Sequence, residues 1–202
     1  MHYLELAQYI TTDPDANLSP LFIAKFLWNI RQMFRFGQKI LADRRKNPRD
    51  DLLTVIATTQ VDGEPMDQSY LDGSWLLIIF AGNDTTRNSM SASINAWNKF
   101  PDEFAKLRQD PTLIDKMVAE IIRWQTPLSH MRRTALEDVE LGGKQIKKGD
   151  KVAMWYVAGN RDERKFENPD DLIFDRENAR NHISFGFGIH RCVGNRLGEL
   201  QL

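Results

Sequence analysis

The chain of 202 residues has few of the features that mark secreted or nucleic-acid-binding proteins. It contains a single cysteine, so no disulfide can form within the chain, and this fits a reducing compartment. Lysine and arginine (27) nearly balance aspartate and glutamate (28), and the formal net charge of −1 gives no overall basic field. These absences predict a cytoplasmic protein with no nucleic-acid partner.

Long apolar runs are also absent. The longest, residues 75–81, is far shorter than the roughly 20 residues that a membrane-spanning helix needs. Residues 1–5 lack the basic start and apolar core of a secretory signal. We therefore expect no membrane span, and a chain long enough for one domain with a sizeable core.

What is present is mostly helical periodicity. Asp67 is a suitable N-cap for a long central helix, which Pro101 would end. Helices are expected over residues 21–46, 51–59, about 67–99, about 102–109 and about 112–125. The sequence thus predicts a mainly α protein with a small β region.

The small β region is expected over about residues 133–157. A hairpin is predicted where Gly142-Gly143 separates two short apolar-alternating segments, and residues 152–157 fit either a buried strand or the start of a helix. Residues 160–182 are polar and irregular. A loop of that length inside a compact domain is either functional or misread.

The middle of the central helix joins an apolar run to polar groups. Residues 76–81 are apolar on all sides, which predicts burial, and residues 82–86 (Gly, Asn, Asp, Thr, Thr) follow at once. Glycine costs about 1 kcal/mol in a helix interior, and a buried carboxylate needs partners. Two interpretations stay open: a kink or widened turn where a ligand replaces missing hydrogen bonds, or a helix that leaves the core with Asp84 solvated.

Two charged motifs follow. Glu120 and Arg123 are three residues apart, on one helix face, but such pairs are common on exposed surfaces, where they contribute little. Arg133, at the start of the β region, could clamp a carboxylate in bidentate fashion. Equally, it could be a surface arginine beside Arg132.

Residues 185–194, Phe-Gly-Phe-Gly-Ile-His-Arg-Cys-Val-Gly, place Cys192 in a glycine-rich loop that can approach a flat ligand closely. The apolar residues after it recur at helical spacing: Val193, Leu197 and Leu200. A helix starting at Cys192 would favour a thiolate, which suits iron. The alternatives are a buried small hydrophobe and a nucleophile activated by His190.

The decapeptide resembles, at every defined position, the haem-ligand loop of the cytochrome P450 family, Phe-Gly-x-Gly-x-His-x-Cys-x-Gly. Upstream and in the same order, residues 81–85 resemble the family's oxygen-activating motif, and Glu120 with Arg123 resembles its Glu-x-x-Arg pair. The resemblance covers essentially all of residues 1–202. It implies the C-terminal half of the P450 fold, with haem b (iron protoporphyrin IX) and an axial thiolate from Cys192.

The resemblance also implies roles for the matching residues. Gly82 would leave space for O₂, Asp84 would relay protons, and Thr85 would hydrogen-bond the bound oxygen. The implied cofactor-binding residues are Cys192, His190, Arg133, Phe185, Gly186, Gly194 and Ala81, of which His190 and Arg133 would hold the haem propionates. The residues expected to face the substrate are Leu77, Phe80 and Leu128.

The Glu-x-x-Arg resemblance implies a buried ion pair that recruits a third basic group from the irregular segment. Arg176 is the first candidate for that group and Arg180 the second. Electrons would come from a ferredoxin-type donor with its reductase. Arg191 and Arg196 would offer it positive charge on the cysteine side, or would form a solvated rim.

The implied activity is a haem-dependent monooxygenase that inserts one oxygen atom of O₂ into an unactivated C–H bond of an apolar molecule. Residues 81–89, 123–128 and 192–197 are most similar to bacterial soluble members that hydroxylate alkanes or fatty acids at the terminal carbon. Because the resemblance extends over only the C-terminal half of the family's fold, we expect these 202 residues to be a partial sequence or a truncated product. The alternative function is a non-catalytic haem-binding remnant or sensor, although Asp84 and Thr85 argue against a sensor; an inert helical scaffold would require three ordered motifs to be accidental.

Overall fold

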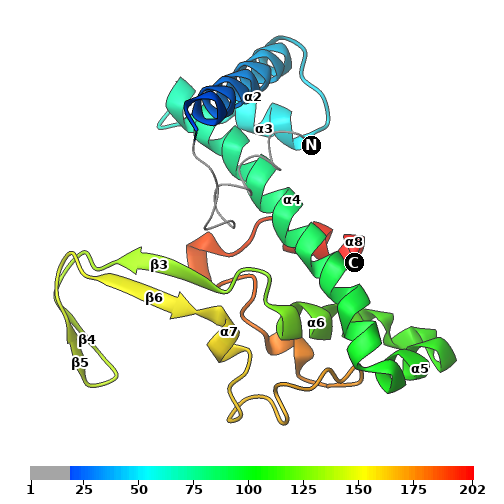
Figure 1. The fold of residues 1–202 in the computed structure, drawn as a ribbon. Coiled ribbons are helices and arrows are strands. Elements are labelled where there is room, and N and C mark those ends of the chain that lie inside the picture. The colour runs from blue at the N-terminus through cyan, green and yellow to red at the C-terminus, as the bar shows by residue number, and fades with distance from the viewer. Residues whose placement is uncertain (1–18) are drawn as a thin grey trace. The chain divides into compact units, whose positions relative to one another are not determined.

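The structure, a computed structural model, describes residues 19–202, which form two compact units that divide after Gly82 (Figure 1). The point of division lies within helix α4 (Gln68–Lys99). Each unit has a buried apolar core of its own.

The first unit contains, in chain order, α2 (Pro20–Lys46), α3 (Leu52–Thr58), β1 (Gln60–Val61), β2 (Glu64–Pro65) and the first part of α4. Side chains cap α2 and α3. The Ser19 hydroxyl accepts a hydrogen bond from Phe22 N at 3.2 Å, and the Asp51 carboxylate accepts one from Thr54 N at 2.8 Å. Each cap satisfies an N–H group that the first helical turn leaves unpaired. Both helix predictions are confirmed, with ends within one residue of those expected.

The core of the first unit is small and centred on Trp75. Its buried members are Leu41, Ala57, Leu71 and Trp75. The indole Nε1 of Trp75 donates a hydrogen bond to the Met33 carbonyl oxygen at 3.2 Å, which satisfies the ring's polar atom inside an apolar cluster.

Helix α4 begins where the sequence predicts. The Asp67 carboxylate accepts hydrogen bonds from Ser69 N at 2.8 Å and Tyr70 N at 3.0 Å, and the helix ends at Lys99, two residues before Pro101. The prediction of a long helix over about residues 67–99 is confirmed.

Two details of α4 differ from expectation. The widened turn considered for residues 82–86 is not present, because α4 is α-helical throughout that stretch. The expected burial of residues 76–81 was also wrong: Leu77 is 67% exposed and Ala81 is exposed. An apolar run on a helix becomes buried only where other elements cover every side of it.

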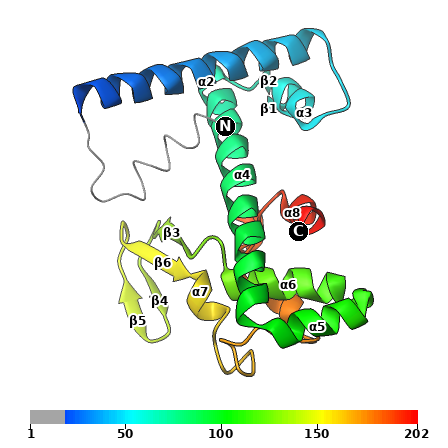
Figure 2. The ribbon, with the colours of Figure 1, turned by 45° about the vertical axis from the view of Figure 1, so that its right-hand side comes forward.

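The second unit contains the rest of α4, then α5 (Pro101–Gln109), η1 (Pro111–Leu113), α6 (Ile114–Gln125), β3 (His130–Thr134), β4 (Val139–Leu141), β5 (Lys144–Ile146), β6 (Lys151–Trp155), α7 (Tyr156–Gly159), η2 (Ala179–Asn181), η3 (Gly188–His190) and α8 (Asn195–Gln201) (Figure 2). The helices expected over about residues 102–109 and 112–125 are confirmed, except that a 3-10 turn precedes α6. Among the helices of residues 19–202, none has the length and apolar character that crossing a membrane requires.

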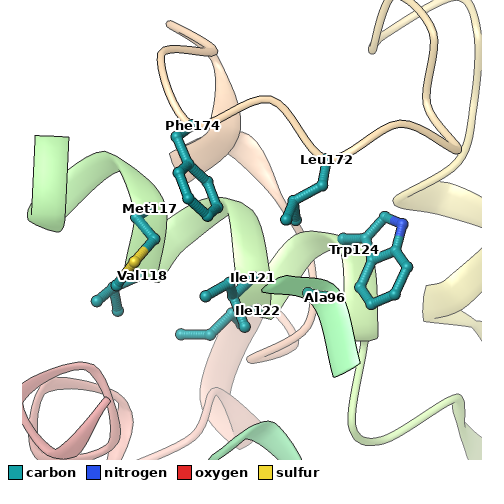
Figure 3. Close-up of a cluster of buried hydrophobic side chains, with 8 residues drawn as sticks. All are labelled: Ala96, Met117, Val118, Ile121, Ile122, Trp124, Leu172 and Phe174. Atoms are coloured by element: carbon teal, nitrogen blue, oxygen red, sulfur yellow. The ribbon is translucent and has the colours of Figure 1, made fainter. Parts of the chain in front are cut away.

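Helix α6 is the centre of the second unit. Every residue from Met117 to Trp124 is buried. Figure 3 shows α6 side chains beside Ala96 of α4 and beside two side chains from the irregular segment, Leu172 and Phe174, in one apolar cluster. The helix therefore meets α4 on one side and the irregular segment on another.

The β region consists of two antiparallel pairs. Strand β4 pairs with β5 around Gly142-Gly143, which confirms the predicted hairpin. Strand β3 pairs with β6, with His130 opposite Trp155. The β region thus starts three residues earlier than expected. Residues 152–157 contain both alternatives, a strand to Trp155 and a helix from Tyr156, but the strand alternates exposed and half-buried positions and is not buried.

Candidate functional site

A fully buried ion pair lies on α6. Glu120 and Arg123 are both 0% exposed, and the guanidinium meets the carboxylate with two bonds, Nε to Oε2 at 2.7 Å and Nη2 to Oε1 at 2.8 Å. Arg176, from the irregular segment, donates from Nε to Oε1 of Glu120 at 2.9 Å. The structure therefore brings together the three residues that the resemblance grouped. Arg180, the second candidate, is instead half exposed, with Nη1 3.7 Å from Glu199 Oε2.

The two buried guanidinium groups are satisfied mainly by backbone oxygens of the irregular segment. Nη1 of Arg123 donates to the carbonyls of Asn160 and Pro169, both at 2.8 Å. Nη1 of Arg176 donates to the carbonyl of Glu167 at 2.6 Å. A buried charge is tolerated only when its donors are paired. Residues 160–182 are therefore folded around these charges.

The irregular segment also contributes apolar residues to the core, which the sequence analysis missed. They are Phe166, Leu172, Phe174 and Ala179, each no more than 2% exposed. The guanidinium carbon of Arg123 lies 5.2 Å from the centre of the Phe166 ring, a cation–π contact. Isolated large apolar residues in an otherwise polar stretch were the signal that could have revealed this packing.

The loop that carries Cys192 is closed by a backbone hydrogen bond. The Cys192 N–H donates to the Phe185 carbonyl at 2.9 Å, across a tight turn in which Gly186 and Gly188 have φ of +70° and +72°. A Cβ on Gly186 would lie 3.1 Å from the Tyr156 hydroxyl, whereas one on Gly188 would meet no atom within 4 Å. Glycine is required at both positions by the backbone conformation.

Cys192 does not begin a helix, contrary to prediction. Helix α8 starts at Asn195, with Gly194 as its N-cap, and the Cys192 N–H is bonded to the loop. The thiol is exposed. So are the large apolar side chains around it in the chain: Phe187 (73%), Ile189 (96%), Val193 (90%), Leu197 (59%) and Leu200 (84%).

Three other residues expected at a cofactor, His190, Arg133 and Phe185, lie on the same unit as Cys192. His190 is exposed in η3, and Arg133 is half-buried on β3, where its Nη1 donates to the Arg132 carbonyl at 3.1 Å. Phe185 is half-buried, with its ring centre 5.4 Å from that of His182. The structure thus positions these side chains around the second unit without joining them by direct bonds to one another.

His182, just before the loop, was not singled out from the sequence. Burial lowers its pKa to about 4, and the positive charges of Arg191, Arg123 and Arg180 add to that effect. Its Nδ1 accepts a hydrogen bond from Ser184 N at 3.3 Å. The imidazole is therefore neutral at physiological pH.

The residues that resemble the oxygen-activating motif divide between the units. Ala81 and Gly82 end the first unit, and both are exposed. In the second unit Asp84 and Thr85 are half-buried on α4. The Asp84 carboxylate accepts hydrogen bonds from Arg87 Nη2 at 3.2 Å and from Asn88 Nδ2 at 3.3 Å.

The expected substrate-facing residues are apolar and accessible to different degrees. Leu77 is 67% exposed, Phe80 is half-buried, and Leu128, after the end of α6, is 39% exposed. The first two belong to the first unit and the third to the second.

The Cys192 loop fits a large flat iron complex. Its sulfur donor is exposed, no Cβ projects at Gly188, and the neighbouring exposed side chains are apolar. A thiolate is a soft ligand that binds haem iron, and apolar side chains pack against the faces of a macrocycle. The residues present therefore suit a haem.

Comparisons with known proteins agree with this geometry. The family description "Cytochrome P450" matches residues 104–202. Linalool 8-monooxygenase of Pseudomonas putida is 42% identical over 190 residues, 94% of this chain and 46% of that protein. Methyl-branched lipid omega-hydroxylase of Mycobacterium bovis is 36% identical over 170 residues, 83% of this chain and 39% of that protein.

Solved structures give the same result. Cytochrome P450-153 from Novosphingobium aromaticivorans superposes with a TM-score of 0.84 at 42% identity, over 100% of this chain and 48% of that one. The chain spans about half the length of the relatives it matches. Sequence, fold and the arrangement around Cys192 and Glu120 together show that the chain belongs to the cytochrome P450 family.

Proposed function

We propose that this chain is part of a haem-dependent monooxygenase that inserts one oxygen atom of O₂ into an unactivated C–H bond of an apolar substrate. The observation that carries the proposal is the exposed Cys192 thiol, set in a glycine-shaped loop among exposed apolar side chains. The monooxygenase names of the relatives support it. In this proposal residues 1–202 form part of one P450 domain, located in the cytoplasm.

The residues of the second unit supply the means of holding the cofactor. Cys192 would ligate the iron, and His190 and Arg133 would pair with the propionates, because both carry donors that are at least partly accessible. Proposed contacts with the faces or edge of the ring come from Phe185, Gly186, Gly194 and Ala81. When bound, the haem supplies the oxygen-activating chemistry, which no side chain of this chain can provide.

The chain's own residues are proposed to deliver protons and to leave room for O₂. We assign Asp84 and Thr85 to an acid–alcohol pair that delivers protons, and Gly82 to a position where the missing side chain leaves room for O₂. The Asp84 carboxylate is held by Arg87 and Asn88, which orient it on α4. Leu77, Phe80 and Leu128 are the proposed apolar contacts of the substrate.

For the substrate we propose an alkane or fatty acid hydroxylated at its terminal carbon. The resemblance of residues 81–89, 123–128 and 192–197 to bacterial alkane and fatty-acid hydroxylases supports this choice, and so does the similarity to a protein named methyl-branched lipid omega-hydroxylase. For the electron donor we propose a ferredoxin-type protein with its reductase, approaching the cysteine side. Arg191 and Arg196 are exposed there, although Arg196 also pairs with Glu199 at 3.2 Å.

Substitution of the ligand tests the cofactor assignment. Cys192→Ser in the full-length protein should abolish the red-shifted Soret band that a thiolate-ligated haem gives when reduced and bound to carbon monoxide. Val193→Ala, which keeps the thiol and changes an exposed neighbour, is the matched control and should keep the band. A Cys192→Ser protein with an unchanged spectrum would refute the assignment.

A second experiment tests the role of the acid–alcohol pair. Thr85→Ala should still bind substrate and consume reduced nicotinamide, but should release more peroxide for each alcohol formed, because protons are delivered less accurately. Thr86→Ala, the adjacent hydroxyl, should keep normal coupling. If Thr85→Ala instead loses substrate affinity at unchanged coupling, Thr85 belongs to the substrate pocket.

A further inference from the structure

A fully buried amide side chain lies between the ion pair and the cysteine loop. Asn160, just after α7, is 0% exposed. Its Nδ2 donates to the hydroxyl oxygens of Thr126 and Ser184, both at 2.8 Å, and its Oδ1 accepts from Ile183 N at 2.8 Å. Both amide hydrogens and the amide oxygen are therefore used.

The hydroxyl groups that Asn160 meets can only accept from it. The Thr126 hydroxyl donates its single hydrogen to the Arg123 carbonyl at 2.7 Å, and the Ser184 hydroxyl donates its own to the Ile122 carbonyl at 2.9 Å. Each hydroxyl has one hydrogen to give. This network fixes the orientation of the amide, with its nitrogen toward the two hydroxyls.

Asn160 connects its own segment to two others that are distant in the chain, the C-terminal end of α6 and residues 183–184. Thr126 ends α6 in the left-handed conformation, with φ of +46°, and Ser184 opens the cysteine loop. The Asn160 carbonyl accepts from Nη1 of Arg123 at 2.8 Å. The backbone and the side chain of one residue thus contact the ion pair, the end of α6 and the start of the loop.

The contact with the loop lies close to the thiol. Ile183, whose N–H is bound by Asn160, accepts a hydrogen bond at its carbonyl from Gly186 N at 2.8 Å. The next residue after Ser184 is Phe185, whose carbonyl receives the Cys192 N–H at 2.9 Å. Displacing residues 183–184 would therefore displace both bonds that shape the loop.

We propose that Asn160 is a positioning residue for the thiolate: it locks residues 183–184 onto the C-terminal end of α6 and thereby holds Cys192 where it can ligate iron. This inference rests on the proposed function of Cys192. Asn160 does not touch the cofactor; it acts through Ser184 and the backbone of the loop.

The chemistry of the site requires an amide. An aspartate has nearly the same shape, but its carboxylate cannot donate to two hydroxyls whose hydrogens are already committed. The two hydroxyl oxygens would then face a carboxylate oxygen without a hydrogen between them. Asn160→Asp thus removes two donated bonds while preserving the side-chain volume and the acceptor for Ile183 N.

The test uses the full-length protein carrying Asn160→Asp, measured with and without haem. Amide hydrogen exchange of residues 183–192 should become about tenfold to hundredfold faster, because one or two hydrogen bonds to buried groups are lost. In the haem-loaded protein, the fraction of the reduced, carbon-monoxide-bound form with the thiolate Soret band should fall. Asn178→Asp is the matched control: its amide makes one bond to the Lys165 carbonyl in the same irregular segment. In the Asn178→Asp protein, the exchange rate of residues 183–192 should change by less than about twofold.

Ser184→Ala gives a second route if Asn160→Asp does not fold. It removes one acceptor of the amide together with the hydroxyl's own bond to the Ile122 carbonyl, and it leaves the bond to Thr126 in place. Faster loop exchange and a smaller thiolate fraction are expected for this variant too. A variant that melts at a lower temperature but keeps wild-type loop exchange and a wild-type thiolate fraction would overturn the proposal, because the amide would then serve stability alone.

The two proposals fail in different ways. If the unmodified protein shows no thiolate band, the function proposed for Cys192 is wrong. Exchange of residues 183–192 without haem still decides whether Asn160 holds the loop. If the unmodified protein shows the band and Asn160→Asp leaves both it and the loop exchange unchanged, the positioning role alone is wrong.

Discussion

The polar network around Arg123 and the loop around Cys192 lie in the same unit and are built on opposite principles. In the network, charges are withdrawn from water and every guanidinium nitrogen of Arg123 has an acceptor. In the loop, apolar side chains and the thiol face outward. The first arrangement is complete within this chain, whereas the second presents a surface that suits an apolar ligand.

The difference shows how a buried, fully hydrogen-bonded network can support an exposed apolar loop. Arg123 binds the backbone carbonyls of Asn160, Pro169 and Asp171, and the side chain of Asn160 binds Ser184 just before the loop. Rigid support of a ligating residue is what a cofactor site requires.

The largest effect is expected inside the network. Arg123→Ala leaves the Glu120 carboxylate buried and stripped of its bidentate partner, which costs about 3–5 kcal/mol of the free energy of unfolding. Urea denaturation followed by circular dichroism measures the loss. Arg164→Ala is the matched control, because Arg164 also pairs with a carboxylate, Asp162 at 2.6 Å, but is 90% exposed. If both variants unfold at the same urea concentration, the network does not stabilise the unit.

The next effect is expected between the two regions, at His182. Burial lowers its folded-state pKa from 6.5 to about 4, so the unfolded chain binds a proton that the folded chain excludes between these pH values. The stabilisation is fully present above pH 6.5 and is lost as the pH falls toward 4, by an amount on the order of 3 kcal/mol.

Equilibrium unfolding from pH 8 to pH 4 measures this dependence. His182→Gln removes the titrating group and should flatten the stability profile over that window, whatever its effect at pH 8. An unchanged slope in the variant would show that His182 is not the group responsible.

A smaller effect is expected within the loop. Gly188 has φ of +72° and open space around it, so Gly188→Ala is opposed by the backbone conformation alone, at about 1–2 kcal/mol. Gly198→Ala, in α8, also meets no atom within 4 Å and should be neutral or stabilising, because alanine favours a helix. Thermal unfolding of the two variants distinguishes conformational strain from the volume of a methyl group.

The smallest effect is expected at the exposed apolar side chains. Val193→Ser changes a residue that is 90% exposed and should alter the free energy of unfolding by no more than about 0.5 kcal/mol. Ile121→Ala, in the buried core, should cost about 2–5 kcal/mol. A large loss for Val193→Ser in the absence of haem would mean that the loop packs against protein after all.

Local sequence patterns predicted most of the helices and strands, because the start and end of these elements depend on residues that are neighbours in the chain. Asp67 marked the start of α4, and Gly142-Gly143 marked the β4–β5 hairpin. The start of the last helix was predicted wrongly, because it does not depend on neighbouring residues alone. Val193, Leu197 and Leu200 have helical spacing, but α8 begins only at Asn195. The hydrogen bond from Cys192 N to Phe185 takes the backbone out of the helix, and spacing alone does not report it.

The sequence by itself determined the order of the elements and the identity of the cysteine, acid, alcohol and ion-pair motifs, since each is written in residues close together in the chain. Only the tertiary structure decided that Arg176 rather than Arg180 reaches Glu120, and that Asn160 connects α6 to residues 183–184. These contacts join residues 23 to 56 positions apart. Buried charges and amides select their partners by where the folded backbone brings a donor or an acceptor within reach, and that placement follows from packing of the whole unit.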